Sequence, residues 1–357
     1  MSEIVFILGA GASKEAGAPL MADFLEKADE LRKTDNLGEY KSDFDDVFNA
    51  ISALQPVHSK SELNLDNIES VFAAFEMGQL INMLPNLSKN NTDSLLLSMK
   101  RLIYKTLEKT ILFPVEDQNI YPPNSYNDFV ELITKLNANA NHNRCSIITF
   151  NYDIGLDYAL NFHDHPANYC LSEDFKQGFV NLFKLHGSVN WAKCSKCGEI
   201  VPFSISDYFK NHHFHFLHGI ESVHLDFVSK LSTSGLTHCQ ELIKSEPVIV
   251  PPTWNKMLHQ QDLSKVWSRA AAELRNAENI FILGYSLPDS DLFFRYFFAL
   301  GSVGPTRIKR FWVFDPNETT VLPRFRSLVG AGIKTKFDFQ PLSFGGAIGF
   351  ITKQFFQ

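Results

Sequence analysis

Polar side chains that directly follow apolar runs are the residues of this sequence best placed to do chemistry. Asn151 and Asp153 follow the run Ile147–Phe150, and His186 follows Phe183–Leu185. An asparagine can orient a water or a hydroxyl, a carboxylate can accept from a carboxamide or a ribose, and an imidazole suits acid–base work near neutral pH. The pattern predicts a catalytic site made of these three residues. Asp153 fits equally well as an Asx turn or helix cap, and a lone histidine is more often structural.

The first residues predict a binding site for a phosphate-containing ligand. The apolar run Ile4–Leu8 leads into Gly9-Ala10-Gly11-Ala12-Ser13, and a helical segment is expected from Lys14 onward. A strand, a glycine turn and a helix N-terminus present backbone N–H groups to an anion, and small residues let a pyrophosphate approach. Gly9, Ala10, Gly11 and Ser13 are therefore candidate dinucleotide-binding residues. The spacing is not a full GxGxxG, so a glycine turn without a ligand is the alternative.

Two later runs end in the same manner. Gly284-Tyr285-Ser286 follows Asn279–Leu283, and Asp315 follows Arg310–Phe314. An acidic residue after a late strand can bind ribose hydroxyls. The alternative for Asp315 is that it caps a helix beginning near Glu318.

The apolar runs predict the fold class, an α/β protein with a Rossmann-like parallel sheet and helices on both faces. Strands are expected at Ile4–Leu8, Ser146–Phe150, Asn181–Leu185, Val248–Val250, Asn279–Leu283 and Arg310–Phe314. In such a fold the chemistry lies at the carboxyl ends of the strands.

The spacing of these strands divides the 357-residue chain into a core and two insertions. We expect the core at 1–38, 142–190 and 246–340, a helical insertion at 39–141, a small insertion at 191–245 and a tail at 341–357. In the helical insertion, apolar residues recur at helical spacing, which mainly indicates core packing, and Asp66 is expected as an N-cap. The alternative is that the insertion covers the ligand cleft or forms an oligomer surface. In the tail, Gly345, Gly346 and Gly349 are expected to interrupt regular structure.

Composition excludes several classes of protein. The net charge of -7 gives no electrostatic reason to expect direct nucleic-acid binding. No apolar run approaches the roughly 20 residues that span a bilayer, and the chain starts with a core strand rather than a signal peptide. Five cysteines, an odd number, favour a reducing cytoplasm over a disulfide scaffold.

A possible metal site lies in the small insertion. Cys194 and Cys197 have the CxxC spacing of zinc ligands. A complete site needs four ligands, and no second CxxC is present. Cys239, with His238 or another nearby histidine, is the candidate to complete it, which predicts a small degenerate zinc-ribbon-like insertion. A remnant that has lost its metal is the alternative.

These motifs, in this order, resemble the sirtuin family, and more closely its prokaryotic sirtuin-like, NAD-consuming branch. The matching pieces are Gly9–Ser13, Thr149–Asp153, Leu185–Gly187, Cys194 with Cys197, Gly284–Ser286 and Asp315. The resemblance implies that Asn151 holds the nicotinamide ribose or the attacking water, that Asp153 engages the nicotinamide carboxamide, and that His186 is the general base. It also implies that the first glycine loop cradles the pyrophosphate of NAD, while Gly284, Ser286 and Asp315 hold the adenosine half.

Departures from the family pattern bear on the reaction. The family's deacylases usually have Asp-Phe-Arg where this chain has Leu20-Met21-Ala22, and their peptide groove usually has a Phe-Gly-Glu-like segment where this chain has Val248–Thr253. The resemblance is therefore closest to members that hydrolyse NAD itself, typically as effectors of bacterial anti-phage defence. It implies an NAD+ glycohydrolase with NAD as substrate and zinc as a possible structural ion.

Unrestricted NAD hydrolysis would drain the cell that makes the enzyme. We therefore expect the activity to be gated by homo-oligomerisation or by a partner protein. Two other functions remain open: an NAD-dependent protein deacylase or ADP-ribosyltransferase, and a non-catalytic nucleotide-binding subunit of a larger assembly.

Overall fold

The computed structural model describes residues 2–34, 37–84, 89–138, 144–172, 178–211, 214, 216, 219–243, 246–251, 261–288 and 291–356. Its centre is a seven-stranded sheet in which every neighbouring pair of strands is parallel. In spatial order the strands are β16 (Phe337–Gln340), β15 (Arg310–Phe314), β14 (Asn279–Leu283), β1 (Ile4–Leu8), β4 (Cys145–Thr149), β6 (Val180–Lys184) and β5 (Ala167–Asn168).

The structure confirms the predicted parallel sheet and corrects one of its strands. The strands expected at Ser146–Phe150 and Asn181–Leu185 each begin and end one residue earlier, and the edge strands β5 and β16 were not expected. The segment Val248–Val250 does not join this sheet. Its strand β13 (Val248–Ile249) pairs antiparallel with β7 (Gly187–Ser188), because Gly187, at φ 82°, turns the chain away directly after β6.

The strand order shows where a ligand would bind. Without the edge strand β5, the order β6-β4-β1-β14-β15-β16 is 3-2-1-4-5-6 in chain order, which is the order of dinucleotide-binding folds. The chain leaves β1 on one side through β4 and returns on the other through β14. The carboxyl ends of β1 and β14 therefore form a topological switch point, where open α/β sheets hold their ligands.

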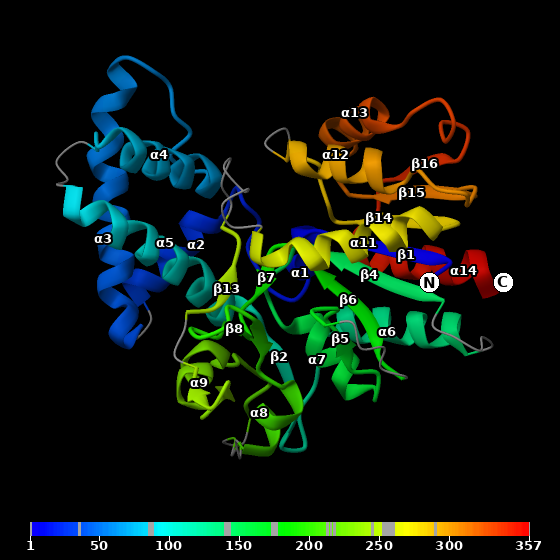
Figure 1. Cartoon of the computed structure of the whole chain (residues 1–357), viewed down its shortest axis with the longest axis horizontal. Coiled ribbons are helices and arrows are strands. Elements are labelled where there is room, and N and C mark those ends of the chain that lie inside the picture. The colour runs from blue at the N-terminus through cyan, green and yellow to red at the C-terminus, as the bar shows by residue number, and fades with distance from the viewer. Residues whose placement is uncertain are drawn as a thin grey trace.

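Both faces of the sheet are covered by helices, as predicted (Figure 1). On β1, Ile4, Phe6 and Leu8 belong to one core cluster, while Val5 and Ile7 belong to the other, since successive side chains of a strand alternate between faces. Helices α6 (Asn124–Asn137), α7 (Gly155–Phe162) and α14 (Phe344–Phe356) cover the first face. Helices α11 (Ser264–Asn276), α12 (Leu292–Gly301) and α13 (Glu318–Leu328) cover the second.

A helical module follows β1 and stands beside the sheet (Figure 1). Its elements are α1 (Ala10–Lys14), α2 (Phe24–Thr34), η1 (Gly38–Tyr40), α3 (Lys41–Leu54), η2 (Gln55–Ser59), α4 (Ile68–Ile81) and α5 (Lys89–Thr110). The N-cap of α4 is Asn67 and not Asp66, because Asn67 has the extended backbone of a cap and accepts from the N–H groups of Glu69 and Ser70.

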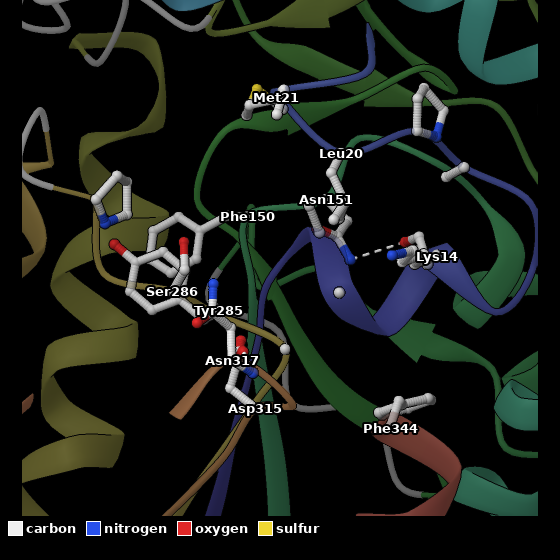
Figure 2. Close-up of a pocket in the computed structure, with 18 of the residues that line it drawn as sticks. Lys14, Leu20, Met21, Phe150, Asn151, Tyr285, Ser286, Asp315, Asn317 and Phe344 are labelled. Carbon is white, nitrogen blue, oxygen red and sulfur yellow. Dashed lines mark hydrogen bonds between the residues drawn. The ribbon is translucent and has the colours of Figure 1, made fainter. Parts of the chain in front are cut away.

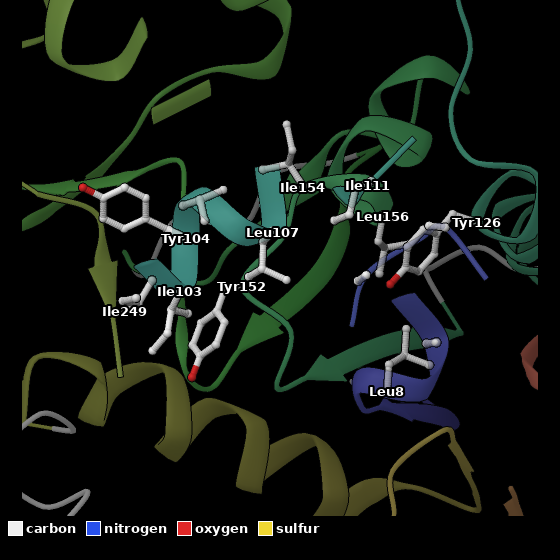
Figure 3. Packing of buried hydrophobic residues seen from close by; sticks show 14 of the residues in the cluster. Leu8, Ile103, Tyr104, Leu107, Ile111, Tyr126, Tyr152, Ile154, Leu156 and Ile249 are labelled. Carbon is white, nitrogen blue, oxygen red and sulfur yellow. The ribbon is translucent and has the colours of Figure 1, made fainter. Parts of the chain in front are cut away.

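Helix α5 joins this module to the sheet (Figure 3). Its buried Ile103 and Leu107 belong to the same core cluster as Tyr152 and Ile154, which follow β4. Most residues of the apolar stripes expected to be core are buried, including Phe72, Phe75, Met99 and these two α5 residues. Leu80, expected in the same stripe as Phe72 and Phe75, is instead 69% exposed. Asn141, the expected end of the helical insertion, lies outside the described residues, and α6 packs on the sheet. We therefore propose that the insertion ends before α6.

The small insertion is built from short hairpins and two short helices. Its elements are β8 (Trp191–Lys193), β9 (Ile200–Pro202), α8 (Ile205–Asn211), β10 (Ser222–Val223), α9 (Phe227–Thr233), β11 (Thr237–His238) and β12 (Glu241–Leu242). Strand β10 pairs with β2 (Phe113–Glu116), which also pairs with β3 (Asn119–Ile120). The remaining described element is η3 (Gln261–Leu263) before α11.

The C-terminal segment differs from its expected irregular structure. Gly345, Gly346 and Gly349 all lie inside helix α14 and do not interrupt it. The buried Phe344 and Ile348 anchor the helix on the sheet, and this packing offsets the roughly 1 kcal/mol that each interior glycine costs. Among the described residues, no helix is both long enough and apolar enough to cross a membrane.

Candidate active site

The carboxyl ends of the strands lie level with one another. Leu8 is paired with Thr149 on one side and Leu283 on the other, Thr149 is paired with Lys184, and Leu283 with Phe314. The residues that directly follow these five positions therefore form a row across the sheet edge. This register explains why polar residues from distant parts of the sequence converge on one site.

A cavity of about 660 Å³ lies at this edge, over the switch point (Figure 2). Every candidate catalytic and NAD-binding residue except Gly9 lines it: Ala10, Gly11, Ser13, Asn151, Asp153, His186, Gly284, Ser286 and Asp315. The helical module closes one side of the cavity with Leu20, Met21, Asn67, Glu69 and Leu107. Pro252 and Thr253, at the end of the segment Val248–Thr253, lie outside the described residues.

The glycines of the first turn are required by a close approach between two loops. A Cβ on Gly9 would lie 2.6 Å from the carbonyl oxygen of Gly284, and a Cβ on Gly11 would lie 2.7 Å from the Cα of Gly284. Gly284 itself has φ 63°. Helix α1 begins at Ala10, not at Lys14 as expected, and has only five residues. It ends there because the chain turns at Gly17, which has φ 101°.

Asn151 is held by contacts on its amide nitrogen. Its Nδ2 donates to the carbonyl oxygen of Gly9 at 2.9 Å and to Oγ of Ser13 at 2.8 Å. The hydroxyl of Tyr126, from the first turn of α6, lies 2.7 Å from Oγ of Ser13 and 3.5 Å from Nδ2 of Asn151. These contacts turn the amide oxygen of Asn151 away from Gly9 and leave it available to a ligand in the cavity.

Asp153 serves the local structure as well as the cavity. Its Oδ1 accepts from the N–H of Gly155 at 2.9 Å, which is the Asx turn considered from the sequence, and its Oδ2 accepts from Ser13 at 2.6 Å. The carboxyl group is buried, and this burial raises its pKa, while the nearby Lys184 ammonium acts in the opposite direction. Each oxygen retains a second lone pair for a ligand.

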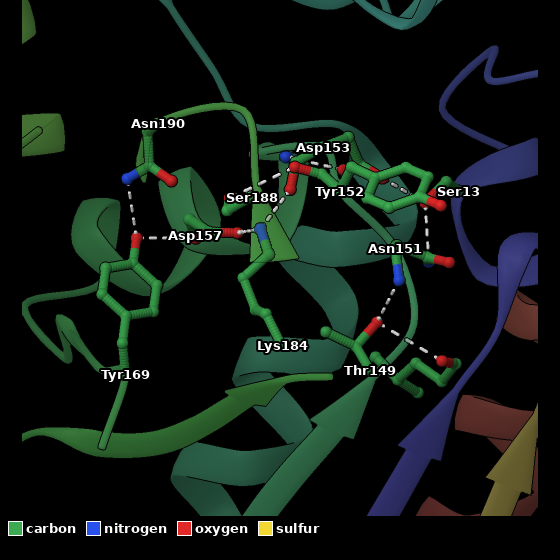
Figure 4. A network of polar contacts seen from close by, with 12 residues as sticks. Ser13, Thr149, Asn151, Tyr152, Asp153, Asp157, Tyr169, Lys184, Ser188 and Asn190 are labelled. Atoms are coloured by element: carbon green, nitrogen blue, oxygen red, sulfur yellow. Dashed lines mark hydrogen bonds and ion pairs between the residues drawn. The ribbon is translucent and has the colours of Figure 1, made fainter. Parts of the chain in front are cut away.

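A buried ion pair supports the loop that carries Asn151 (Figure 4). Nζ of Lys184, at the end of β6, lies 2.9 Å from Oδ2 of Asp157 and donates to the carbonyl oxygen of Asp153 at 2.5 Å. Both side chains of the ion pair are 1% exposed. Tyr169 donates to the other carboxylate oxygen of Asp157 and accepts from Asn190. The network ties β6 to the turn between β4 and α7.

His186 lies among aromatic rings at the cavity wall. Its ring centroid is 5.0 Å from that of Phe150, edge to face, and 6.1 Å from that of Tyr152, nearly parallel. Its carbonyl oxygen accepts from the N–H of Val250 at 2.7 Å, and the hydroxyl of Tyr152 donates to the carbonyl oxygen of Val250. Strand β13 therefore fixes the backbone of His186 from one side, and the residues after β4 fix its ring from the other.

The opposite end of the cavity is formed after β14 and β15. Tyr285 stacks on Phe150 with ring centroids 4.6 Å apart. Asp315 accepts from the N–H of Asn317 at 2.8 Å, while Asn317 itself is the N-cap of α13. Asp315 is therefore not the helix cap, and burial raises the pKa of its carboxyl group. Arg324 of α13 donates to the carbonyl oxygen of Ser286.

The cysteine cluster forms a separate site on the small insertion. Cys194 and Cys197 come from the turn between β8 and β9. His238 is the last residue of β11, and Cys239 begins the turn to β12. Their four ligand atoms lie within 4.8 Å of one another, and Nδ1 of His238 is 3.4 Å from each of the sulfurs of Cys197 and Cys239. Tetrahedral zinc with these ligands places them about 3.6 Å apart. The set therefore fits zinc.

The surroundings of the cluster also suit a metal ion. Backbone N–H of Cys197 and the imidazole of His238 lower the pKa of Cys194 to about 6, which favours the thiolate that zinc requires. Nε2 of His238 points to Glu199 at 3.5 Å, a usual arrangement for a metal-bound histidine. None of the four residues lines the cavity. An ion held there would stabilise the insertion without touching a ligand of the cavity.

Three buried residues of the site were not predicted: Tyr126, Asp157 and Lys184. A helix that precedes a parallel strand runs back along the sheet, so its first turn lies at the carboxyl ends of the strands. This rule points to Tyr126, on the apolar face of the helix before β4. A lysine at the end of the apolar run Val180–Leu185 was a second available signal, because a buried lysine needs a partner.

No protein-family model and no curated protein matches the chain. Among solved structures, the chain is similar to a Sir2 homologue in complex with NAD, at 15% identity and a TM-score of 0.40, covering 98% of this chain and 88% of that chain. It is also similar to a structure described for the mechanism and regulation of Sir2 enzymes, at 14% identity and 0.41, covering 99% and 92%. A third is Sir2Tm bound to a propionylated peptide, at 12% identity and 0.36, covering 98% and 92%.

Proposed function

We propose that this protein is an NAD+ glycohydrolase that cleaves the bond between nicotinamide and ribose and releases nicotinamide and ADP-ribose. The observation that supports it best is that Asn151 and His186 line the same cavity as Gly284, Ser286 and Asp315, over the switch point of a sheet with dinucleotide-binding strand order. The order of the sequence motifs, which resembles that of sirtuins, supports the same substrate.

In this proposal NAD extends along the row of strand ends. The nicotinamide ribose lies between Asn151 and His186, the pyrophosphate lies beside Gly11, and the adenosine ribose lies beside Asp315. The free lone pairs of Asp153 accept from the nicotinamide carboxamide. Gly11 and Gly284 pack backbone to backbone, so no side chain from either residue projects into this path.

The reaction needs a positioned water and a stabilised cationic sugar rather than a strong nucleophile. The C–N bond to nicotinamide breaks, and its electron pair stays on the nicotinamide nitrogen, which becomes neutral. A water oxygen bonds to the anomeric carbon, and its proton passes to the imidazole of His186. The amide oxygen of Asn151, directed by the contacts of its Nδ2, accepts from the water or a ribose hydroxyl.

We further propose that the activity is gated by assembly, and that the protein acts in the cytoplasm as an effector of anti-phage defence. Exposed apolar residues offer two surfaces for such assembly. One lies on and after α4, with Met77, Leu80, Ile81 and Met83, and the other on and after α12, with Leu292, Tyr296, Leu300 and Val303. Their exposed fractions reach 79% at Leu300. The five cysteines are all free thiols, which suits a reducing compartment.

The test measures nicotinamide released from NAD by the purified protein. Nicotinamide is detected by chromatography, and the assay is repeated over a wide range of protein concentration. We expect little release from the dilute chain and more as it assembles or meets its partner. Asn151→Ala and His186→Ala should abolish the release. His163→Ala is the matched control, because His163 is the C-cap of α7, contacts Asn127 and does not line the cavity.

Two results would overturn the proposal. One is full turnover by both Asn151→Ala and His186→Ala. The other is the absence of nicotinamide release under every condition in which the wild-type chain binds NAD, which would favour a non-catalytic nucleotide-binding subunit. Adding an acetyl-lysine peptide to the same assay tests the deacylase alternative, since a deacylase releases nicotinamide only when the peptide is present.

A further inference from the structure

The hydroxyl of Tyr126 is buried behind residues that line the cavity and contacts two of them, Ser13 and Asn151. Tyr126 is 1% exposed and does not line the cavity. Among the described residues its hydroxyl contacts Oγ of Ser13 at 2.7 Å and accepts a long hydrogen bond from Nδ2 of Asn151 at 3.5 Å. An amide nitrogen cannot accept a hydrogen bond. The phenol therefore donates its proton to Ser13.

This donation fixes the remaining hydrogen bonds of Ser13. Its Oγ carries one hydrogen, which is donated to Oδ2 of Asp153 at 2.6 Å. The two lone pairs of Oγ then accept from Tyr126 and from Nδ2 of Asn151. The hydrogen and both lone pairs of the Ser13 hydroxyl are therefore used, and the donor and acceptor of each hydrogen bond are assigned.

The same set fixes the rotation of the Asn151 side chain. One N–H of Nδ2 is directed at Ser13, and the other at the carbonyl oxygen of Gly9. A flipped amide would place its oxygen against the Gly9 carbonyl, acceptor against acceptor. The Asn151 amide oxygen is thus directed by a chain of contacts that starts at Tyr126.

We propose that Tyr126 is a positioning residue for the NAD-hydrolysing site: its hydroxyl orders Ser13, and Ser13 orders Asn151 and Asp153. This inference rests on the proposed function. Loss of the hydroxyl leaves one lone pair of Ser13 without a donor in a buried place, so that Ser13 and Asn151 gain other orientations. Tyr126 itself does not line the cavity, so its effect reaches NAD only through Ser13, Asn151 and Asp153. We expect the larger part of it in the chemical step, because that step needs the fixed amide oxygen of Asn151.

The test compares Tyr126→Phe with Tyr158→Phe. Tyr158 is an equally suitable buried tyrosine, 6% exposed, whose hydroxyl donates to the carbonyl oxygen of Ile120 away from the cavity. Both changes remove one buried hydroxyl and keep the ring, so both lower the melting temperature by similar amounts. We expect kcat for nicotinamide release to fall about tenfold in Tyr126→Phe alone, with a smaller change in KM.

A double-mutant cycle of Tyr126→Phe and Ser13→Ala distinguishes a positioning role from a purely structural one. Once Ser13→Ala is present, Tyr126→Phe should reduce kcat much less than it does in the wild type, because only the long contact of Tyr126 with Asn151 remains. A second readout needs no turnover: the side-chain NH2 resonances of Asn151, assigned by their absence in Asn151→Ala, should shift and exchange faster with solvent in Tyr126→Phe and stay unchanged in Tyr158→Phe.

The outcomes separate this inference from the proposed function. Equal kcat values for the two variants, or full additivity with Ser13→Ala, overturn the positioning role while the NAD hydrolase stands. If the wild-type chain releases no nicotinamide, the proposed function fails, and the resonances of Asn151 still decide whether Tyr126 orders that side chain. Unchanged resonances in Tyr126→Phe would overturn the inference.

Discussion

Gly11 and Gly284 meet backbone to backbone at the switch point of the sheet. The N–H of Gly11 donates to the carbonyl oxygen of Gly284 at 2.8 Å, and a Cβ on Gly11 would lie 2.7 Å from the Cα of Gly284. Two turns that are 273 residues apart in the sequence thus close the floor of the cavity together. The absence of a side chain at Gly11 is required by the protein itself, before any ligand is considered.

We therefore expect Gly11→Ala to separate the two turns and weaken NAD binding more than tenfold, with a loss of stability of about 1–3 kcal/mol from overpacking. Isothermal titration with NAD and urea unfolding measure the two effects. Gly349→Ala is the control, because no atom lies within 4 Å of its added Cβ and alanine favours the helix there. Wild-type stability and affinity in Gly11→Ala would contradict the packing role of this glycine.

The proposed place of Asp315 beside the adenosine ribose implies that the protein binds NAD more tightly than NADP. A carboxylate beside the adenosine ribose accepts from its 2′-hydroxyl and repels a 2′-phosphate. We expect Asp315→Asn to lower the ratio of NAD affinity to NADP affinity about tenfold. Asp338→Asn is the control: it changes a carboxylate that does not line the cavity and should leave this ratio unchanged. Equal ratios in wild type and Asp315→Asn would place the adenosine ribose elsewhere.

Removing one partner of the buried ion pair between Lys184 and Asp157 should destabilise the protein more than removing both. Lys184→Met leaves the Asp157 carboxylate buried without its cation, so we expect a loss of about 3–5 kcal/mol in the free energy of unfolding, measured in urea. Adding Asp157→Leu to this variant should recover much of that stability. Nicotinamide release should not recover with it, because the ammonium donor to the carbonyl oxygen of Asp153 is still missing.

A double variant with full turnover would show that the carbonyl contact of Lys184 has no part in the reaction. A double variant as unstable as Lys184→Met alone would show that the loss of stability comes from the packing around β6 rather than from the uncompensated charge of Asp157.

The cysteine cluster predicts one zinc ion per chain. We expect the purified protein to hold about one equivalent of zinc by plasma emission spectroscopy, and Cys197→Ser to lose it and to unfold at a lower temperature. Cys170→Ala, at a free cysteine outside the cluster, should keep the metal. Equal zinc content in Cys197→Ser and wild type would exclude this cluster as the site.

The amino-acid sequence is sufficient to predict most of the central strands and the strand ends at which the candidate site residues lie. Short apolar runs such as Ile4–Leu8 and Asn279–Leu283 were found at their observed bounds, because a strand buried on both faces must be continuously apolar. The polar residues Asn151, His186 and Asp315 stood out because each interrupts such a run where the strand ends.

The contacts that hold these residues in place become visible only in the folded chain. Tyr126, Lys184 and Asp157 act through contacts between elements that are distant in the sequence, and periodicity carries no information about such contacts. The same holds for Gly11, whose conformation alone would permit other residues and whose restriction comes from Gly284. Local spacing specifies which face a side chain occupies, but partners across a sheet edge follow from strand order and register, which the whole chain sets when it folds.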